Sequence, residues 1–214
     1  MADPTVTALV VTPGETPFLN RTLKGLREQS RNPNRIVLIN VGDDVAPIDD
    51  DIEVISVGNA KNFGDAIRRA TKVQPSILDS DWLWTLHDDS APFPGCLEAL
   101  VQTGEDGLTI GIVGPKQIAW SNPDRLLEVG IKASSAGRRL DYLLPGEIDQ
   151  GQHDNTADVL GVGTAGMLIR SELWEATDGP DPVLGPFGEG IELSRRVRLM
   201  GHRAAIAPAA KVAH

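Results

Sequence analysis

Short apolar runs alternate with helix-like segments through the first half of the chain, and this alternation most limits its fold. The apolar runs span residues 5–11, 36–39, 52–57 and 82–86, and leucine or alanine recurs at helical spacing over residues 17–29 and from Gly64 onward. Strands that alternate with helices predict a parallel sheet in a doubly wound α/β domain. In such a sheet, ligands bind beyond the carboxyl ends of the strands.

The second half of the chain has a less regular pattern. It predicts helices over residues 94–101 and 189–200, short strands over residues 111–115 and 204–207, and a Gly-rich apolar segment over residues 159–169. Residues 121–158 are rich in Gly, Asp and Arg, so we expect long loops or a small irregular subdomain there. Thr16 is a candidate N-cap with Pro17 at the first helical position, and Gly201 is a candidate C-cap.

Charge and cysteine content exclude several classes of function. The net charge of -10 argues against nucleic acid as the main partner, because phosphate binding needs a cationic face. Cys96 is the single cysteine, so neither an intrachain disulfide nor a thiolate metal cluster can form. No apolar run approaches the ~20 residues that span a bilayer. We therefore expect a cytoplasmic domain that reaches the inner face of the plasma membrane only through parts outside this chain.

The pair Asp88-Asp89 directly follows the apolar run at residues 82–86. Side chains at adjacent strand positions point to opposite faces, so only one of these carboxylates easily faces a given cleft. One carboxylate together with a substrate diphosphate is a typical Mg²⁺ or Mn²⁺ arrangement. The alternative is that the pair only starts a turn and caps the helix that follows.

Two further segments combine polar side chains with helix starts. Asn62 and Gly64 stand at a loop-to-helix junction, where a glycine lets the backbone approach a ligand and where Asn62 can equally be a plain N-cap. Glu189 and Glu192 share one face of a helix start, either as a general base or as residues that favour the helix dipole. His202 and His214 are candidates for metal or acid–base roles, although a single histidine is more often structural.

The order of these elements along the chain resembles glycosyltransferase family 2, with the GT-A fold. The most specific segments are residues 82–98 (WLWTLHDDSAPFPGCLE) and residues 161–214, which resemble actinobacterial rhamnosyl- and galactofuranosyl-transferase-like enzymes of cell-envelope synthesis. The resemblance covers nearly the whole chain and implies a single GT-A domain, a Rossmann-like α/β fold with a mixed, mostly parallel sheet flanked by helices. Its nucleotide-binding half is about residues 1–115, and its acceptor and catalytic half about residues 116–214.

The resemblance also implies a role for each matched residue. Asp89 and His214 match metal ligands for Mn²⁺ or Mg²⁺, and Glu189, with Glu192 as its substitute, matches the catalytic base. The donor-binding matches are Thr12, Pro13, Asn40, Asn62, Gly64, Asp88, Gly166 and Arg196. Three positions depart from the family pattern: His87 replaces the first acid of an Asp-x-Asp motif, Asn40 replaces an Asp, and Gly190 replaces the second acid of the catalytic motif.

These matches together predict an inverting, metal-dependent transfer. The donor would be a UDP- or dTDP-linked sugar and the acceptor a cell-envelope glycan or a lipid-linked molecule. Because Gly190 lacks an acid, a catalytically weak or inactive nucleotide-sugar-binding domain is an alternative. A nucleotidyltransferase is a further alternative, but residues 12–20 (TPGETPFLN) contain no Lys or Arg to hold a triphosphate. As the chain ends on the matched metal ligand His214, we expect it to be part of a longer protein.

Overall fold

The structure is a computed structural model that describes residues 3–42, 51–135, 139–140, 143–155, 158–185 and 188–214. Its helices are α1 (Leu19–Arg27), α2 (Phe63–Val73), α3 (Cys96–Glu105), α4 (Ser171–Thr177) and α5 (Glu189–Leu199), with a 3₁₀ helix η1 at Pro75–Asp79. Its strands are β1 (Val6–Thr12), β2 (Arg35–Asn40), β3 (Glu53–Ser56), β4 (Trp82–His87), β5 (Ala91–Pro92), β6 (Ile110–Ala119), β7 (Asn122–Glu128), β8 (Lys132–Ala133), β9 (Arg139–Leu140), β10 (Asp158–Val159), β11 (Leu168–Arg170) and β12 (Arg203–Ala213).

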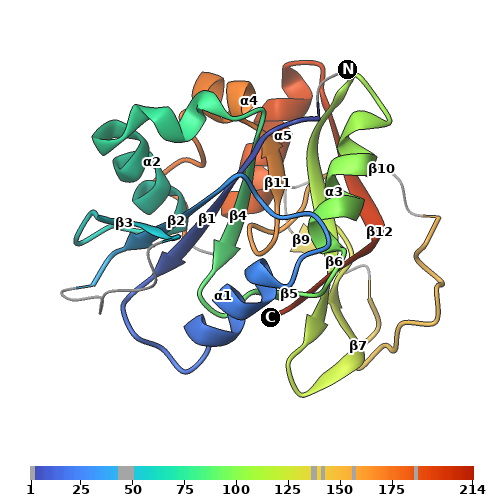
Figure 1. Cartoon of the computed structure of the whole chain (residues 1–214). Coiled ribbons are helices and arrows are strands. Elements are labelled where there is room, and N and C mark those ends of the chain that lie inside the picture. Colours follow the sequence, from blue (N-terminus) through green and yellow to red (C-terminus); the bar gives the residue numbers. More distant parts are fainter. Residues whose placement is uncertain (1–2, 43–50, 136–138, 141–142, 156–157, 186–187) are drawn as a thin grey trace.

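One large sheet runs through the molecule in the order β10-β12-β6-β11-β4-β1-β2-β3, with β5 added at β12 and β7 at β6 (Figure 1). The long pairings β1–β2, β1–β4, β2–β3 and β6–β12 are parallel. The short strand β11 lies antiparallel between β4 and β6. The sheet is therefore mixed and mostly parallel, as expected. The carboxyl ends of β1, β2 and β4 lie at one edge of it.

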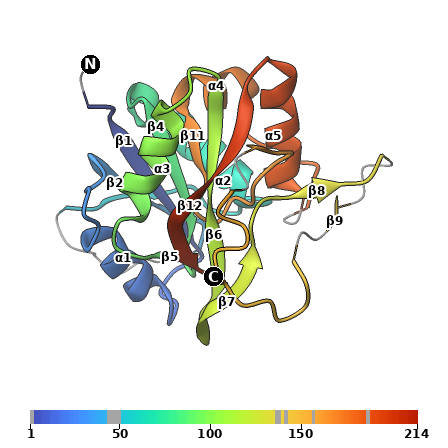
Figure 2. The same ribbon diagram turned by 90° about the vertical axis from the view of Figure 1, so that its right-hand side faces the viewer.

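Helices cover both faces of this sheet, and the side-chain alternation of each strand divides the core in two. On β1, Ala8 and Val10 belong to the cluster that includes Leu23 of α1 and Leu97 of α3. The residue between them, Leu9, faces the other cluster, which includes Ile67 of α2. Helices α4 and α5 lie on the same side as α2, and Figure 2 shows α3 and α5 on opposite sides of the sheet.

Side-chain hydrogen bonds lie at the starts of two of the helices, and one of them is an N-cap. The Asn62 side chain accepts a hydrogen bond from the Asp65 amide at 2.9 Å, so Asn62 caps α2 as the sequence indicates. Helix α1 begins at Leu19 with Phe18 as its N-cap, so the predicted N-cap at Thr16 and the predicted first residue at Pro17 are both wrong. Thr16 still accepts a hydrogen bond from the Leu19 amide at 3.2 Å. Its hydroxyl also donates to Asp88, which holds the residues before Leu19 outside the helix.

The second half is more regular than its sequence indicates. Strand β7 pairs antiparallel with β6, and β8 pairs with β9, within a region where the sequence predicts loops or a small subdomain. Strand β12 extends to Ala213, well past the predicted residue 207, and α4 has no counterpart in the prediction. Strand β12 is rich in alanine and β7 contains proline and charged residues, so neither has the β-branched composition that marks a strand.

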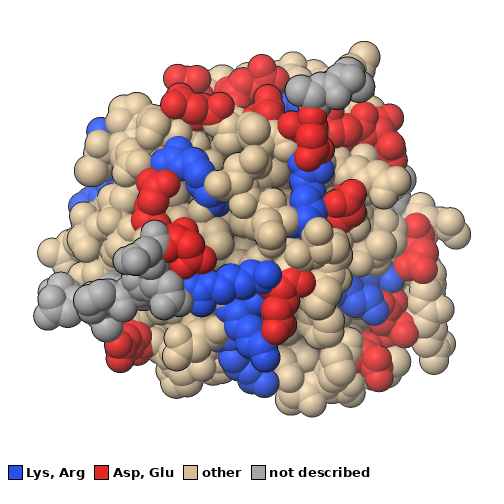
Figure 3. Space-filling view, in the orientation of Figure 1, with Lys and Arg blue, Asp and Glu red and all other residues tan. Residues whose placement is uncertain are grey.

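The described helices include none that is long and apolar enough to cross a membrane. Acidic side chains outnumber basic ones in the chain, which contains 30 Asp and Glu against 20 Lys and Arg. On the face shown in Figure 3, basic side chains are interspersed with acidic ones over the surface.

A buried ion-pair network attaches the segment after β7 to the sheet. Lys116 of β6 is 2% exposed, and its ammonium group donates to Asp149 at 2.7 Å and to Asp154 at 2.5 Å. Lys211 of β12 lies 2.9 Å from the second carboxylate oxygen of Asp149. Two neighbouring strands therefore share one buried carboxylate, which fixes residues 149–154 beside them.

We expect Lys116→Ala to reduce the free energy of unfolding by about 3 kcal/mol, because the change leaves a buried carboxylate short of its partner. Lys24→Ala, which breaks only the exposed pair with Glu28, is the matched control and costs less than about 0.5 kcal/mol. Urea denaturation measures both changes. Equal losses in the two variants would show that the buried network contributes no more than a surface pair.

Candidate active site

Three side chains from two distant parts of the chain meet beyond the carboxyl end of β4. His87 is the last residue of β4, Asp89 follows two residues later, and His214 follows the last residue of β12. One potential ligand atom from each of the three lies within 4.8 Å of the others. The His214 Nε2 atom is 3.4 Å from the Asp89 Oδ1 atom. The structure thus places together Asp89 and His214, the two residues that the sequence predicts as metal ligands.

His87 is the member of this cluster that the sequence interpretation did not assign to the metal. β4 ends at His87, and in the turn that follows it the Asp89 side chain lies beside His87, whereas the Asp88 side chain bonds Thr16. The His87 Nε2 atom is 2.9 Å from the Thr164 hydroxyl, and its ring centre is 4.4 Å from that of Phe63. Burial and the nearby His214 lower the pKa of His87 to about 4. His87 is therefore neutral at pH 7, which is the form that binds a metal ion.

Asp89 is held by both its side chain and its backbone. The His214 imidazole keeps the pKa of the Asp89 carboxyl below its usual value, against the opposing effect of burial. The Trp120 indole Nε1–H donates to the Asp89 carbonyl oxygen at 2.8 Å. Asp89 is consequently an ionised carboxylate in a position fixed by its neighbours.

Asp88 lies on the opposite side of the same turn and makes different contacts. The Thr16 hydroxyl donates to its carboxylate at 2.6 Å, and the Thr22 hydroxyl donates to its backbone carbonyl at 2.8 Å. Burial raises the pKa of Asp88. Asp88 therefore connects the end of β4 to the loop and helix that follow β1, and its predicted contact with the donor stays a prediction.

The loops after β1 and β2 pack tightly against each other. The Thr12 hydroxyl donates to the Gly14 carbonyl at 2.6 Å, and the Asn40 side chain bonds the backbone of Gly42 through both its oxygen and its nitrogen. A Cβ at Gly42 would lie 1.9 Å from the Pro13 carbonyl oxygen, so residue 42 must be glycine for these loops to meet. Thr12, Pro13 and Asn40, the predicted nucleotide-contacting residues, are thus brought together at one edge of the sheet.

The start of α2 and the start of α5 form a second group of predicted residues. The Gly64 amide donates to the Glu189 carboxylate at 2.8 Å, and Glu189 is only 1% exposed. Burial raises the pKa of Glu189, although the bond from Gly64 acts in the opposite direction. The Asn62 carboxamide donates to the Leu184 carbonyl at 2.9 Å. In this structure Asn62, Gly64 and Glu189 join two helix ends to each other.

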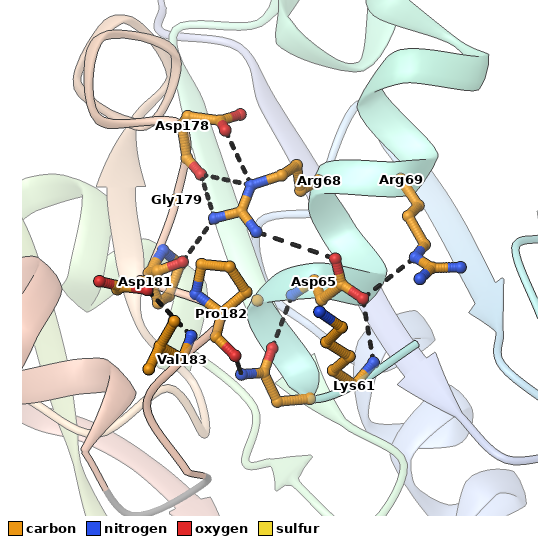
Figure 4. A network of polar contacts seen from close by, with 12 residues as sticks. Lys61, Asp65, Arg68, Arg69, Asp178, Gly179, Asp181, Pro182 and Val183 are labelled. Atoms are coloured by element: carbon orange, nitrogen blue, oxygen red, sulfur yellow. Dashed lines mark hydrogen bonds and ion pairs between the residues drawn. The ribbon is translucent and has the colours of Figure 1, made fainter. Parts of the chain in front are cut away.

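The same region contains a network of charged side chains around residues 178–183, shown in Figure 4. Arg68 of α2 is largely buried and donates to the carbonyl oxygens of Asp178 and Pro180. Arg196 of α5 pairs with Glu192 and also donates to the Thr177 carbonyl at 2.6 Å. Glu192 in turn accepts a hydrogen bond from the Asp181 amide at 3.1 Å. Glu192 and Arg196, predicted for catalysis and donor binding, hold the segment between α4 and α5.

A cavity of about 340 Å³ opens beside the histidine–aspartate cluster. Its lining includes His87, His214, Thr164, Gln117, Glu128 and the backbone of Gly190. Gly166 follows the lining residues Gly163, Thr164 and Ala165, and a Cβ there would meet the side chains of Pro115 and Val212. The sequence interpretation missed Thr164, Gln117 and Glu128. Gln117 and Glu128 are paired residues of β6 and β7. A prediction of β7 from the sequence would have been needed to bring these two residues together.

The donor set of the cluster fits a divalent metal ion. Imidazole nitrogens and carboxylate oxygens are common ligands of divalent metal ions in proteins. His202, the other histidine considered, stands before the first residue of β12 and so at the far end of that long strand from His214. The cluster and the adjoining cavity could therefore hold a metal ion beside a bound substrate.

Comparison with known proteins gives one family and a set of similar folds. The family model described as "Glycosyltransferase like family 2" matches residues 4–214. Among the solved structures that match is GalNAc-T7 with UDP, GalNAc and Mn²⁺, with a TM-score of 0.73 and 15% sequence identity. The match covers 99% of this chain but 44% of that one, so this chain spans less than half of that protein's length. The likeness confirms the GT-A fold. No curated protein matches the sequence.

We expect Asp89→Asn and His214→Ala each to weaken Mn²⁺ binding at least about tenfold, because each removes one of three clustered ligands. Asp88→Asn is the matched control and should stay within about threefold of the original protein, since Asp88 faces Thr16. Titration calorimetry with MnCl₂ measures all three. If Asp88→Asn weakened Mn²⁺ binding as much as Asp89→Asn, the assignment of the two carboxylates would be wrong.

Proposed function

This chain belongs to glycosyltransferase-like family 2, and from that premise we propose that it transfers a sugar from a nucleoside-diphosphate donor to an acceptor hydroxyl, with inversion at the anomeric carbon. The observation that carries the proposal is the cluster of His87, Asp89 and His214 at the strand-end edge of a GT-A sheet. The adjoining cavity has room for a substrate beside that cluster.

We propose that the three clustered side chains hold Mn²⁺, with Mg²⁺ as the weaker choice. Bound there, the ion would offset the negative charge that develops on the leaving diphosphate. The net charge of -10 is compatible with this proposal, because a bound cation and backbone amides can hold a diphosphate without a basic surface. The GalNAc-T7 structure, which contains UDP and Mn²⁺, supports the same combination on the same fold.

The donor-binding residues are proposed from their places around this edge. The packed loops after β1 and β2 include Thr12, Pro13 and Asn40. Thr16, in the loop after β1, bonds Asp88 just after the end of β4. We propose that these loops contact the nucleoside of a UDP- or dTDP-linked sugar. A second set of residues would act on the donor by fixing the loops and helix ends that surround it. This set is Asp88, Asn62, Gly64, Gly166 and Arg196, as their hydrogen bonds and packing indicate.

The acceptor and the place of action are proposed from the sequence resemblance alone. A cell-envelope glycan or a lipid-linked molecule would provide the hydroxyl group. The chain would then work on the cytoplasmic side of the plasma membrane, attached through other parts of a longer protein. Transfer assays with a soluble glycan and with a lipid-linked molecule as the acceptor would separate these two acceptor classes.

A specific observation favours a second function, which is nucleotide-sugar binding without turnover. Gly190 stands where relatives are expected to have a second acid, and a Cβ there would lie 2.2 Å from the Val162 carbonyl oxygen. This part of α5 therefore has no space for an added carboxylate unless the backbone shifts. A domain with bound donor and no transfer or hydrolysis would fit this alternative.

A thermal-shift panel of UDP- and dTDP-linked sugars, each with and without MnCl₂, tests the donor proposal. A donor at a hundred times its dissociation constant adds about 2.7 kcal/mol, which raises the melting temperature by about 5–10 °C. We expect that shift for one nucleotide and only with MnCl₂. A panel without any metal-dependent shift would contradict the proposed function, whereas a shift without sugar release would support the binding module.

If Glu189 is the catalytic base, as the sequence predicts, Glu189→Gln should abolish transfer and leave donor binding intact. Glu192→Gln tests the substitute in the same way. Steady-state turnover and calorimetry with UDP and MnCl₂ give the two quantities. Unchanged turnover in Glu189→Gln would remove that residue from the reaction, and loss of folding would show that its bond to the Gly64 amide is structural.

A further inference from the structure

We propose that Glu128, at the end of β7, is the group that accepts the proton from the acceptor hydroxyl. This inference rests on the proposed transferase function and assigns one residue within it. Of the described residues that line the cavity beside the histidine–aspartate cluster, Glu128 alone has a carboxylate. The carboxylates of Glu189 and Glu192 are bonded elsewhere, to the backbone of Gly64 and Asp181.

The Glu128 carboxylate has a defined position in the cavity wall. Its Oε1 atom accepts a hydrogen bond from the Gly163 amide at 2.6 Å, and its Oε2 atom accepts one from the Arg139 guanidinium at 2.5 Å. The next residue after Gly163, Thr164, bonds His87. Two successive residues of one loop therefore hold the carboxylate and a member of the metal cluster, so their separation is set by the backbone.

Two glycines, Gly190 of α5 and Gly163 of that loop, explain why the acid comes from β7. On one side, the absence of a side chain at Gly190 lets α5 pack directly on Val162 and Gly163. On the other side, a Cβ at Gly163 would lie 2.8 Å from Glu128 Oε1 and 2.9 Å from Gln117 Nε2. The loop thus leaves no space for an acidic side chain at residue 190. Because residue 163 is a glycine, the Glu128 side chain has space beside the same loop.

The surroundings of Glu128 suit a base that must stay in place. The Glu128 side chain is 9% exposed, and the Arg139 guanidinium offsets its buried charge. A hydrogen bond from a backbone amide leaves the lone pairs of the carboxylate available for one more partner. That partner would be the acceptor hydroxyl in the cavity.

The reaction balances with this single proton acceptor. The acceptor oxygen forms a bond to the anomeric carbon while its proton passes to a Glu128 oxygen. The bond between the anomeric carbon and the diphosphate oxygen breaks, and its electron pair leaves with the diphosphate. Glu128 then releases the proton to water, which restores the carboxylate.

Rescue by azide tests this assignment, because azide attacks the anomeric carbon without a proton to lose. The assay follows UDP or dTDP release from the donor of the thermal-shift panel with MnCl₂ and water as the acceptor. We expect Glu128→Ala and Glu128→Gln to lower this rate by about 100-fold or more. Sodium azide should restore turnover in Glu128→Ala and yield the inverted glycosyl azide, which mass spectrometry and proton NMR identify.

Three comparisons make the result specific. Glu175→Gln, an exposed carboxylate on α4, is the matched control and should keep the original rate. Glu189→Ala should show no azide rescue. Binding of UDP with MnCl₂, measured by calorimetry, should stay within about threefold in Glu128→Gln, which keeps the size of the side chain and an oxygen to accept the Gly163 bond.

Each other outcome overturns the assignment. Unchanged release in Glu128→Gln would show that the carboxylate takes no proton, and rescue in Glu189→Ala would place the base on α5. A loss that azide does not restore would make Glu128 a positioning residue. Absence of both donor binding and release for every donor in the original protein would contradict the transferase function itself, a result distinct from failure of Glu128 alone.

Discussion

The site depends on β12 keeping its pairing with β6 to the end of the strand. Ala213 is in register with Ile118 of β6 and also with Ala91 of β5, and the His214 amide donates to the Ile118 carbonyl at 2.9 Å. Because β5 directly follows the turn that contains Asp89, these backbone hydrogen bonds set the distance between Asp89 and His214. The histidine–aspartate cluster is thus positioned in part by a backbone ladder.

The parallel part of the fold could be predicted from the sequence because each strand is a local signal. β-Branched and apolar runs mark β1, β2 and β4 without reference to any other part of the chain. The same is true of Asn62, whose capping role needs only the residues that follow it. Strand alternation also indicated that only one of Asp88 and Asp89 would face the cleft, but it did not draw attention to His87, which shares that face.

The rest of the site could not be predicted because it depends on contacts between distant residues. Strand β7 is mostly exposed and contains Pro123, Asp124 and Arg125, so only its pairing with β6 makes it a strand and brings Glu128 to the cavity. The family resemblance implies that Glu189 is the base. Its contact with Gly64 could not be predicted, because that contact joins helix starts that are 125 residues apart. Gly190 stands where the family pattern has an acid, and the structure uses it for close packing of the α5 start on the loop that contains Val162 and Gly163.

The hydrogen bond from Trp120 to the Asp89 carbonyl has an optical consequence. Trp120 is half-buried, next to the Arg21 guanidinium at 4.8 Å and the Phe18 ring at 5.8 Å, whereas Trp82, Trp84 and Trp174 are at most 2% exposed. Changes of indole emission that respond to solvent therefore come mainly from Trp120. Its indole N–H is bonded to the residue that supplies the carboxylate of the cluster. The chain thus contains its own fluorescent reporter of any movement in the Asp89 turn, and needs no added label.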